Sequence, residues 1–180
     1  NSGKSSFVNR VLGEPICPVE ACPTTSSITR FKYSPDREIV MVTPGQKGRE
    51  VRRPIGAERY CRLVTHAGRN SASSGPMRFE FLGDFPLLKK IDLVDTPGFE
   101  NPKNPYDQAV TEAEMRRADV LFYLIDINQG AVTGSGLETL AAIRADAPEA
   151  PVYLVINKAD TKPPSARERV LRRVESDYSK

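Results

Sequence analysis

The chain has 180 residues, of which 39% are hydrophobic and 27% are charged. This length and composition are typical of a single globular domain, which excludes whole-chain disorder, collagen and coiled coil. The net charge of +3 is too small to indicate nucleic acid as a partner, and the longest apolar stretches are far shorter than the ~18 residues of a membrane span.

The N-terminal end carries the second half of a phosphate-binding P-loop. Residues 1–6 read Asn-Ser-Gly-Lys-Ser-Ser, and a helix is predicted at 4–12, ended by Gly13 and Pro15. The complete motif has an earlier glycine that follows a β-strand, and neither precedes residue 1 in this sequence. We therefore expect a fragment that lacks the central strand of a P-loop sheet, the strand between those predicted at 91–95 and 120–126.

Strands dominate the next part of the chain. β-Branched and aromatic residues at 28–42 predict a β-hairpin around a turn at 34–37. Residues 43–76 are harder to assign, and we interpret them as an insert that contains a short helix at 57–65. Two further strands are predicted, at 77–82 and 91–95.

Helices and strands alternate in the C-terminal half. A helix is predicted at 104–118, and strands are predicted at 120–126 and 152–156. Capping boxes that begin at Ser135 and Ser165 predict the starts of two more helices. The alternation predicts an α/β fold, with a mainly parallel sheet and helices on both faces. The last helix has an apolar stripe that we expect to be buried, formed by Val170, Leu171, Val174 and Tyr178.

The residue types of the P-loop half-motif suit phosphate and Mg2+. Gly3 lets the backbone wrap phosphate oxygens, the Lys4 ammonium reaches the β and γ phosphates, and the Ser5 hydroxyl is a Mg2+ ligand. Taken alone, the same three residues also fit a chance Gly-Lys-Ser at the start of a helix.

A second motif follows the strand predicted at 91–95. Asp95 stands at the carboxyl end of that strand, where open α/β sheets bind ligands, and it can hold Mg2+ through water. Gly98 can bring its backbone N–H to the γ-phosphate, so loss of this phosphate would release the following loop. Taken alone, residues 95–98 also fit an ordinary turn.

A third motif, Asn-Lys-Ala-Asp at 157–160, follows the strand predicted at 152–156. The Asp160 carboxylate can accept from the ring N–H and the amino group of guanine, an arrangement that adenine does not offer. Lys158 can lie across the face of the ring. The three motifs in this order predict binding of GTP and GDP rather than ATP.

These motifs resemble those of the dynamin superfamily of GTPases, especially bacterial dynamin-like proteins, over nearly the whole chain. Residues 4–13 lead to Cys-Pro-Thr-Thr at 22–25, and Phe-Pro-Leu-Leu at 85–88 runs into the motif at 95–98. A long insert separates Thr25 from Asp95, where small Ras-like GTPases have a short loop and one strand.

The resemblance implies a partial GTPase domain over residues 1–180, without its first strand and first P-loop glycine and without its final strand and helix. It also implies a role for Thr25 as the family's nucleotide-sensing threonine, in preference to Thr24. The implied catalytic residues are Asn1, Lys4, Thr25 and Gly98. The implied Mg2+ ligands are Ser5, Thr25 and Asp95. The implied nucleotide-binding residues are Asn1, Ser2, Gly3, Lys4, Ser5, Ser6, Asn157, Lys158 and Asp160.

Two roles are open for Asn1. GTPases that use a bound K+ or Na+ ion in place of an arginine finger often carry asparagine at this position, and such an ion stabilises charge on the phosphate. Asn1 can equally cap the P-loop by hydrogen bonds. No glutamine follows Gly98, so we do not expect catalysis on the Ras pattern.

Three functions fit these residues. The first is a dynamin-like GTPase head that pairs as a homodimer through its nucleotide face and drives membrane remodelling, with peripheral membrane contact through segments outside this sequence. The second is a GTPase in ribosome or RNA maturation, against which the long insert and the lack of a strong basic stripe argue. The third is a scaffold that binds guanine nucleotides without hydrolysis. Three cysteines without a secretory context favour free thiols and a cytoplasmic location.

Overall fold

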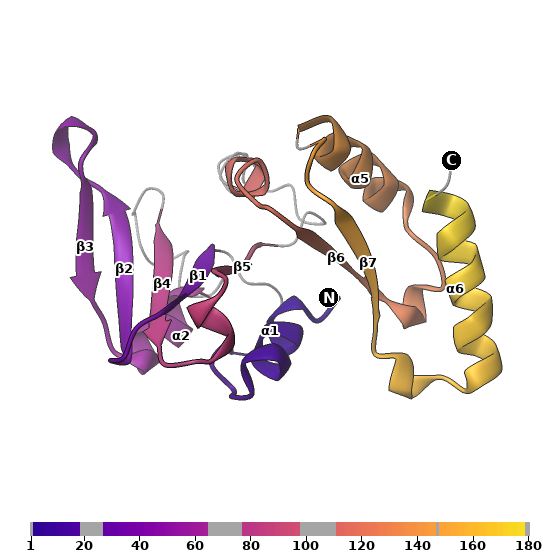
Figure 1. Ribbon diagram of the computed structural model, residues 1–180, viewed down its shortest axis with the longest axis horizontal. Coiled ribbons are helices and arrows are strands. Elements are labelled where there is room, and N and C mark those ends of the chain that lie inside the picture. The colour runs from indigo at the N-terminus through magenta and orange to yellow at the C-terminus, as the bar shows by residue number, and fades with distance from the viewer. Residues whose placement is uncertain (1, 19–26, 65–76, 98–110, 147, 179–180) are drawn as a thin grey trace. The chain divides into compact units, whose positions relative to one another are not determined.

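The computed structural model describes residues 2–18, 27–64, 77–97, 111–146 and 148–178. The chain divides into two compact units (Figure 1), the N-terminal unit, Lys4–Gly98, and the C-terminal unit, Asn1–Gly3 with Phe99–Lys180. Within the described residues, no helix combines the length and the apolar character that a membrane crossing requires.

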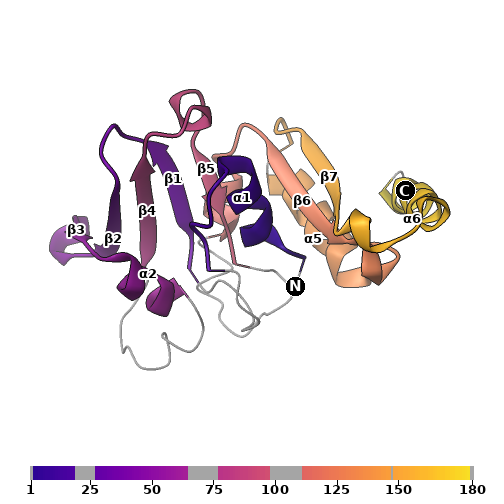
Figure 2. The ribbon, with the colours of Figure 1, turned by 90° about the horizontal axis from the view of Figure 1, so that it is seen from below.

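The N-terminal unit is built on a five-stranded sheet (Figure 2). Its strands are β1 (Thr29–Tyr33), β2 (Glu38–Pro44), β3 (Glu50–Pro54), β4 (Arg78–Gly83) and β5 (Leu93–Asp95), in the spatial order β3-β2-β4-β1-β5. β1 and β4 are parallel, and the other three pairings are antiparallel. The sheet of this unit is therefore mixed, and the prediction of a mainly parallel sheet is wrong for it. Short links such as the turn between β2 and β3 can join only antiparallel neighbours.

Residues 28–42 contain two strands, but the predicted hairpin is wrong. β4 lies between β1 and β2, and Phe81 is opposite Phe31 on one side and Ile39 on the other. Phe79, also on β4, is 0% exposed. A central position for β4 buries both of its phenylalanine rings, and this apolar burial outweighs direct pairing of β1 with β2.

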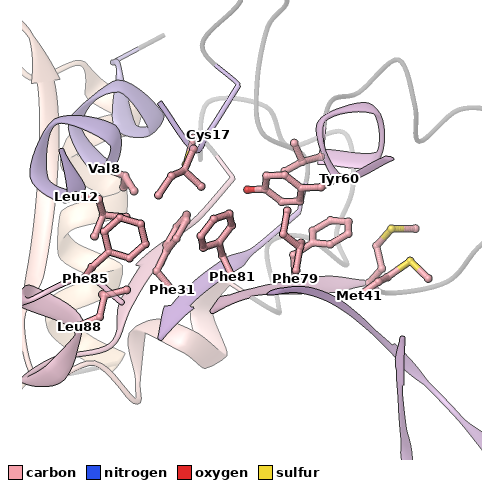
Figure 3. Packing of buried hydrophobic residues seen from close by; sticks show 14 residues of the cluster. Val8, Leu12, Cys17, Phe31, Met41, Tyr60, Phe79, Phe81, Phe85 and Leu88 are labelled. Atoms are coloured by element: carbon pink, nitrogen blue, oxygen red, sulfur yellow. The ribbon is translucent and has the colours of Figure 1, made fainter. Parts of the chain in front are cut away.

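The two α-helices that the structure describes in the N-terminal unit agree closely with the predicted ranges. They are α1 (Lys4–Leu12) and α2 (Ala57–Val64). α1 is followed by Gly13, whose φ of 81° is in the left-handed region that glycine adopts without strain. The core (Figure 3) holds α1 and α2 on the sheet and includes Val8, Leu12, Phe31, Tyr60, Phe79, Phe81, Phe85 and Leu88. It therefore fixes the helix whose first turn carries Lys4 and Ser5.

The insert contains a strand that the sequence analysis missed. β3 follows the 3-10 turn Gln46–Gly48 and pairs with β2. An ion pair joins Arg52 to Glu80 of β4, and Arg78 of β4 contacts Glu50 at 2.7 Å. Charged pairs across the sheet thus take the place of the alternating apolar residues that usually identify a strand.

The side chain of Asn9 on α1 holds the loop that follows the helix. Its Oδ1 accepts from the backbone N–H groups of Ile16, at 3.0 Å, and Cys17, at 2.7 Å. Its Nδ2 donates to the Cys17 carbonyl at 2.8 Å. Ile16 and Cys17 are both buried, so water cannot readily replace these bonds.

Asn9→Ala is therefore expected to destabilise the full-length protein by about 3 kcal/mol, because it leaves buried backbone groups unpaired. Denaturant unfolding measures the loss, and hydrogen exchange localises it to residues 14–18. Gln46→Ala removes an amide from an exposed position and is the matched control. Equal exchange at 14–18 in the wild type and Asn9→Ala would contradict the prediction.

The C-terminal unit contains a two-stranded parallel sheet. β6 (Leu121–Asp126) and β7 (Val152–Asn157) pair in register along their whole lengths, so Asp126 is opposite Asn157 at the carboxyl ends. Helices α5 (Gly134–Asp146) and α6 (Pro164–Tyr178) supply Leu140 and Val174 to the core on one face of this sheet. β5 and β6 belong to different sheets. Residues 111–115 are helical, and the predicted N-terminal part of that helix lies outside the described residues.

Helices α5 and α6 begin before their predicted capping boxes. The hydroxyl of Thr133 accepts from the Gly136 N–H at 3.1 Å, two residues ahead of Ser135. α6 begins at Pro164, a residue type that suits the first helical position, so Ser165 is inside the first turn.

The buried stripe of α6 is narrower than predicted. Val174 is 2% exposed, whereas Leu171 is 46% exposed, so the prediction for Leu171 is wrong. Val170 and Tyr178 are partly buried against the same core. Only residues that face the two-stranded sheet are covered, because the helix turns Leu171 about 100° away from Val170.

Candidate functional site

Two of the predicted Mg2+ ligands lie together in the N-terminal unit. Ser5 is in the first turn of α1, and Asp95 is the last residue of β5. The Ser5 hydroxyl donates to Asp95 Oδ2 at 2.9 Å, although 90 positions separate the two residues in the sequence. The hydrophobic core holds α1 against the sheet and so determines this contact.

Asp95 is a buried carboxyl group, 3% exposed. Burial raises its pKa, while the Ser5 hydroxyl, the positive charge of Lys4 and the backbone N–H of Thr96 act in the opposite direction. A cation beside Asp95 would stabilise the charged form that burial opposes. Hydroxyl and carboxylate oxygens are the hard ligands that Mg2+ prefers, so Ser5 and Asp95 fit this ion.

The phosphate-loop residues of the C-terminal unit are held by Asn157. Its Nδ2 donates to the Ser2 carbonyl at 2.9 Å and lies 3.5 Å from the Gly3 carbonyl oxygen. Gly3 has a φ of 80°, and a Cβ atom at this position would lie 2.5 Å from Asn157 Nδ2. The backbone conformation therefore favours glycine, and a Cβ atom at this position would also displace the Asn157 amide.

The segment after β7 turns sharply at Lys158. Asn157 Oδ1 accepts from the Lys158 N–H at 2.9 Å, and Lys158 has a φ of 58° in the left-handed region. The Thr161 hydroxyl donates to the Lys158 carbonyl at 2.7 Å and supports the 3-10 turn Ala159–Thr161. Asp160 in this turn is exposed, and no partner for its carboxylate occurs among the described residues. Its carboxylate is thus accessible to a ligand.

Asp126 contacts Lys158 of the third motif, and the sequence analysis did not select it as a candidate. Its Oδ2 accepts from Lys158 Nζ at 2.6 Å, and its Oδ1 accepts from the backbone and side-chain amides of Asn128, both at 2.9 Å. Burial alone would raise the pKa of Asp126, but the hydrogen bonds from Lys158 and Asn128 outweigh it and lower the pKa. The sequence did carry a signal for this residue, because Asp126, like Asp95, is an acid at the carboxyl end of a predicted strand.

Of the remaining predicted site residues, some are described by the structure and others are not. Ser6 is exposed and Lys4 is partly buried. Asn1, Thr24, Thr25 and Gly98 lie outside the described residues, so their predicted roles stay predictions. Cys17 and Cys61 are free thiols, and in the described ranges no three His, Cys, Asp or Glu residues group as a metal site would need.

Comparison with known proteins identifies the family. Residues 1–160 match the model of the dynamin family. The chain belongs to the dynamin family. This match confirms the resemblance inferred from the motifs at 1–6, 95–98 and 157–160.

Relatives of this dynamin-family chain include two bacterial proteins. Dynamin-like protein 2 of Campylobacter jejuni subsp. jejuni is 26% identical over 126 residues, which cover 70% of this chain and 20% of that protein. GTPase Era of Lacticaseibacillus paracasei is 24% identical over 186 residues, which cover 99% of this chain and 43% of that protein.

A solved structure of an oligomerised bacterial dynamin pair has a similar fold. Its TM-score is 0.60 at 22% identity, and the alignment covers 100% of this chain and 27% of that one. The likeness supports the dynamin GTPase-domain fold, a P-loop NTPase fold. The dynamin-family chain spans less than half the length of each of these relatives.

Proposed function

We propose that this dynamin-family chain binds GTP with Mg2+ and hydrolyses it. The observation that carries the proposal is the hydrogen bond from Asn157 to the Ser2 carbonyl, 2.9 Å long across 155 positions in the sequence. This bond joins the phosphate loop to the segment 157–160. A nucleotide has its phosphates and its base at opposite ends, so recognition of both requires these two segments at a fixed separation.

The phosphate end is assigned to residues 2–6 and Asp95. The backbone at Gly3 cradles the phosphates, and the Lys4 ammonium contacts their β and γ oxygens. Ser5 and Asp95 would hold Mg2+ at this end, Ser5 through its hydroxyl and Asp95 through its carboxylate. Bound Mg2+ supplies positive charge that stabilises the negative phosphate oxygens.

Three further assignments rest on the family pattern. Thr25 would help to hold Mg2+ and would orient the attacking water, with Thr24 as the alternative. The Gly98 N–H contacts the γ-phosphate. Asn1 either holds a K+ or Na+ ion beside the phosphates or caps the loop.

The base end is assigned to Lys158 and Asp160. The exposed Asp160 carboxylate accepts from the guanine ring N–H and amino group, and Lys158 lies across the ring. Rejection of adenine follows, because adenine would leave the carboxylate without those donors.

For the whole protein we propose a dynamin-like role in membrane remodelling. The GTPase domain pairs with a second copy through its nucleotide face. In the whole domain, helices cover both faces of the sheet. Residues 43–76 form the dynamin-type insert. The protein is cytoplasmic and contacts the membrane peripherally through segments outside this chain.

A GTPase acting in ribosome or RNA maturation is the second candidate. The similarity to GTPase Era over nearly the whole chain favours it, whereas the family match and the insert favour the dynamin-like role. Cosedimentation of the full-length protein with anionic liposomes or with ribosomes separates the two. A scaffold that does not hydrolyse GTP is distinguished by the absence of phosphate release.

The full-length protein is expected to bind GTP and GDP with Mg2+ at least about a hundredfold more tightly than ATP, and to release phosphate from GTP. A ratio of this size is expected because adenine leaves the charged Asp160 acceptor without either of its two hydrogen-bond donors. Titration calorimetry and a phosphate-release assay measure the two properties. Equal affinity for ATP would refute the base assignment, and GTP binding without turnover would favour the scaffold.

A further inference from the structure

We propose that Asp126 is a positioning residue for guanine recognition, which it serves by holding the Lys158 side chain in place. This inference rests on the proposed function and adds a residue to its base-binding end. Asp126 is on β6, whereas the segment 157–160 follows β7, so the assignment brings a second strand into the site.

The geometry fixes Lys158 at both ends. At one end, the Asn157 side chain holds the Lys158 backbone N–H at 2.9 Å, in a left-handed conformation with a φ of 58°. At the other end, Lys158 Nζ donates to Asp126 Oδ2 at 2.6 Å. The methylene groups between these two points are thus confined before any ligand arrives.

We expect the methylene groups of Lys158 to be the part of this side chain that packs on the guanine ring. The Lys158 side chain is 40% exposed, whereas that of Asp126 is 13% exposed. The charged end is therefore bound to the less exposed of the two side chains, and part of the Lys158 side chain stays accessible. The stem also lies near the phosphate loop, because Lys158 Cε is 3.9 Å from the position that a Gly3 Cβ would occupy.

Asp126 is itself held firmly enough to act as an anchor. Both of its oxygens are engaged, Oδ1 by the two amides of Asn128 and Oδ2 by Lys158. Its opposition to Asn157 in the β6–β7 register places it beside Lys158, the next residue along the chain. Ordering a free lysine side chain opposes binding, so a lysine that is already ordered binds the base more tightly.

Asp126→Asn is the variant that tests the proposal, since it keeps the shape but replaces one acceptor oxygen by an N–H donor. We expect the Kd for GDP and the KM for GTP to rise by about tenfold each, with kcat unchanged, because base binding is common to substrate and transition state. Titration calorimetry and steady-state turnover of the full-length protein measure these values. Asp119→Asn, an exposed acid before β6, is the matched control.

A double-mutant cycle separates positioning from a purely structural role. Lys158→Met keeps an apolar stem without the ammonium, so Asp126→Asn should no longer weaken GDP binding in that background. An equal loss in both backgrounds would overturn the proposal, as would unchanged GDP affinity in the single variant. If Asp126→Asn does not fold, Asp126→Ala in the same cycle gives the same test. A wild type that binds GDP no better than ADP would refute the proposed function itself, and this inference with it.

Discussion

Asp160→Asn in the full-length protein is expected to weaken GDP binding by about a hundredfold and to create affinity for xanthosine diphosphate. The carboxylate offers two acceptors to guanine, whereas asparagine offers one acceptor and one donor. Xanthine carries a carbonyl where guanine carries its amino group, so its hydrogen-bonding pattern suits the amide.

The structure indicates that this substitution should leave the fold of the turn unchanged. Asp160 is exposed, and the turn that carries it is held by the Thr161 hydroxyl through the Lys158 carbonyl rather than by the Asp160 side chain. The backbone should therefore stay in place. Titration calorimetry with GDP and with xanthosine diphosphate measures the two affinities. Glu149→Gln, which changes an exposed acid before β7, is the control. An unchanged ratio of the two affinities would place base recognition elsewhere.

Ser5→Ala is expected to remove most of the stabilisation that Mg2+ gives to bound GTP. The affinity for GTP in the presence of Mg2+ should fall by about tenfold to a hundredfold. The substitution deletes a hydroxyl that lies 2.9 Å from Asp95, and so removes one proposed metal ligand and its hydrogen bond to the other. The affinity for GTP measured in EDTA should differ little between Ser5→Ala and the wild type, because no metal is then present to bind.

Further variants test whether Ser5 and Asp95 act on the same metal ion. Asp95→Asn should also reduce the effect of Mg2+. The double variant should lose little more than either single variant, because the proposed function assigns both residues to one ion. Ser165→Ala in the first turn of α6 removes an exposed hydroxyl and is the control. A Mg2+ effect of wild-type size in Ser5→Ala would exclude Ser5 as a ligand.

The local parts of the fold were predictable from the sequence. α1, α2 and β7 lie within one or two residues of the predicted ranges. Helix periodicity, glycine at a helix end and runs of β-branched residues are local signals, so they act regardless of distant contacts. The three motifs were visible for the same reason, since each is a short segment beside one helix or strand.

The partners of those elements were not predictable. β4 separates β1 from β2 because a central place buries Phe79 and Phe81, and no property of residues 28–42 indicates this. β3 was missed because its ion pairs with β4, such as Arg52 with Glu80, involve residues far apart in the chain. Asp126 was missed for a similar reason, because its ion pair with Lys158 crosses from β6 to the end of β7.

The sequence by itself thus indicated which residues suit phosphate, Mg2+ and guanine by their chemistry, because this suitability belongs to the side chains and their spacing. Only the tertiary structure decided which of them meet. Ser5 reaches Asp95 because the core packs α1 on the sheet, and Asn157 reaches Ser2 because β7 ends beside the loop. Contacts between distant segments depend on burial shared by many side chains, and short sequence patterns do not carry that information.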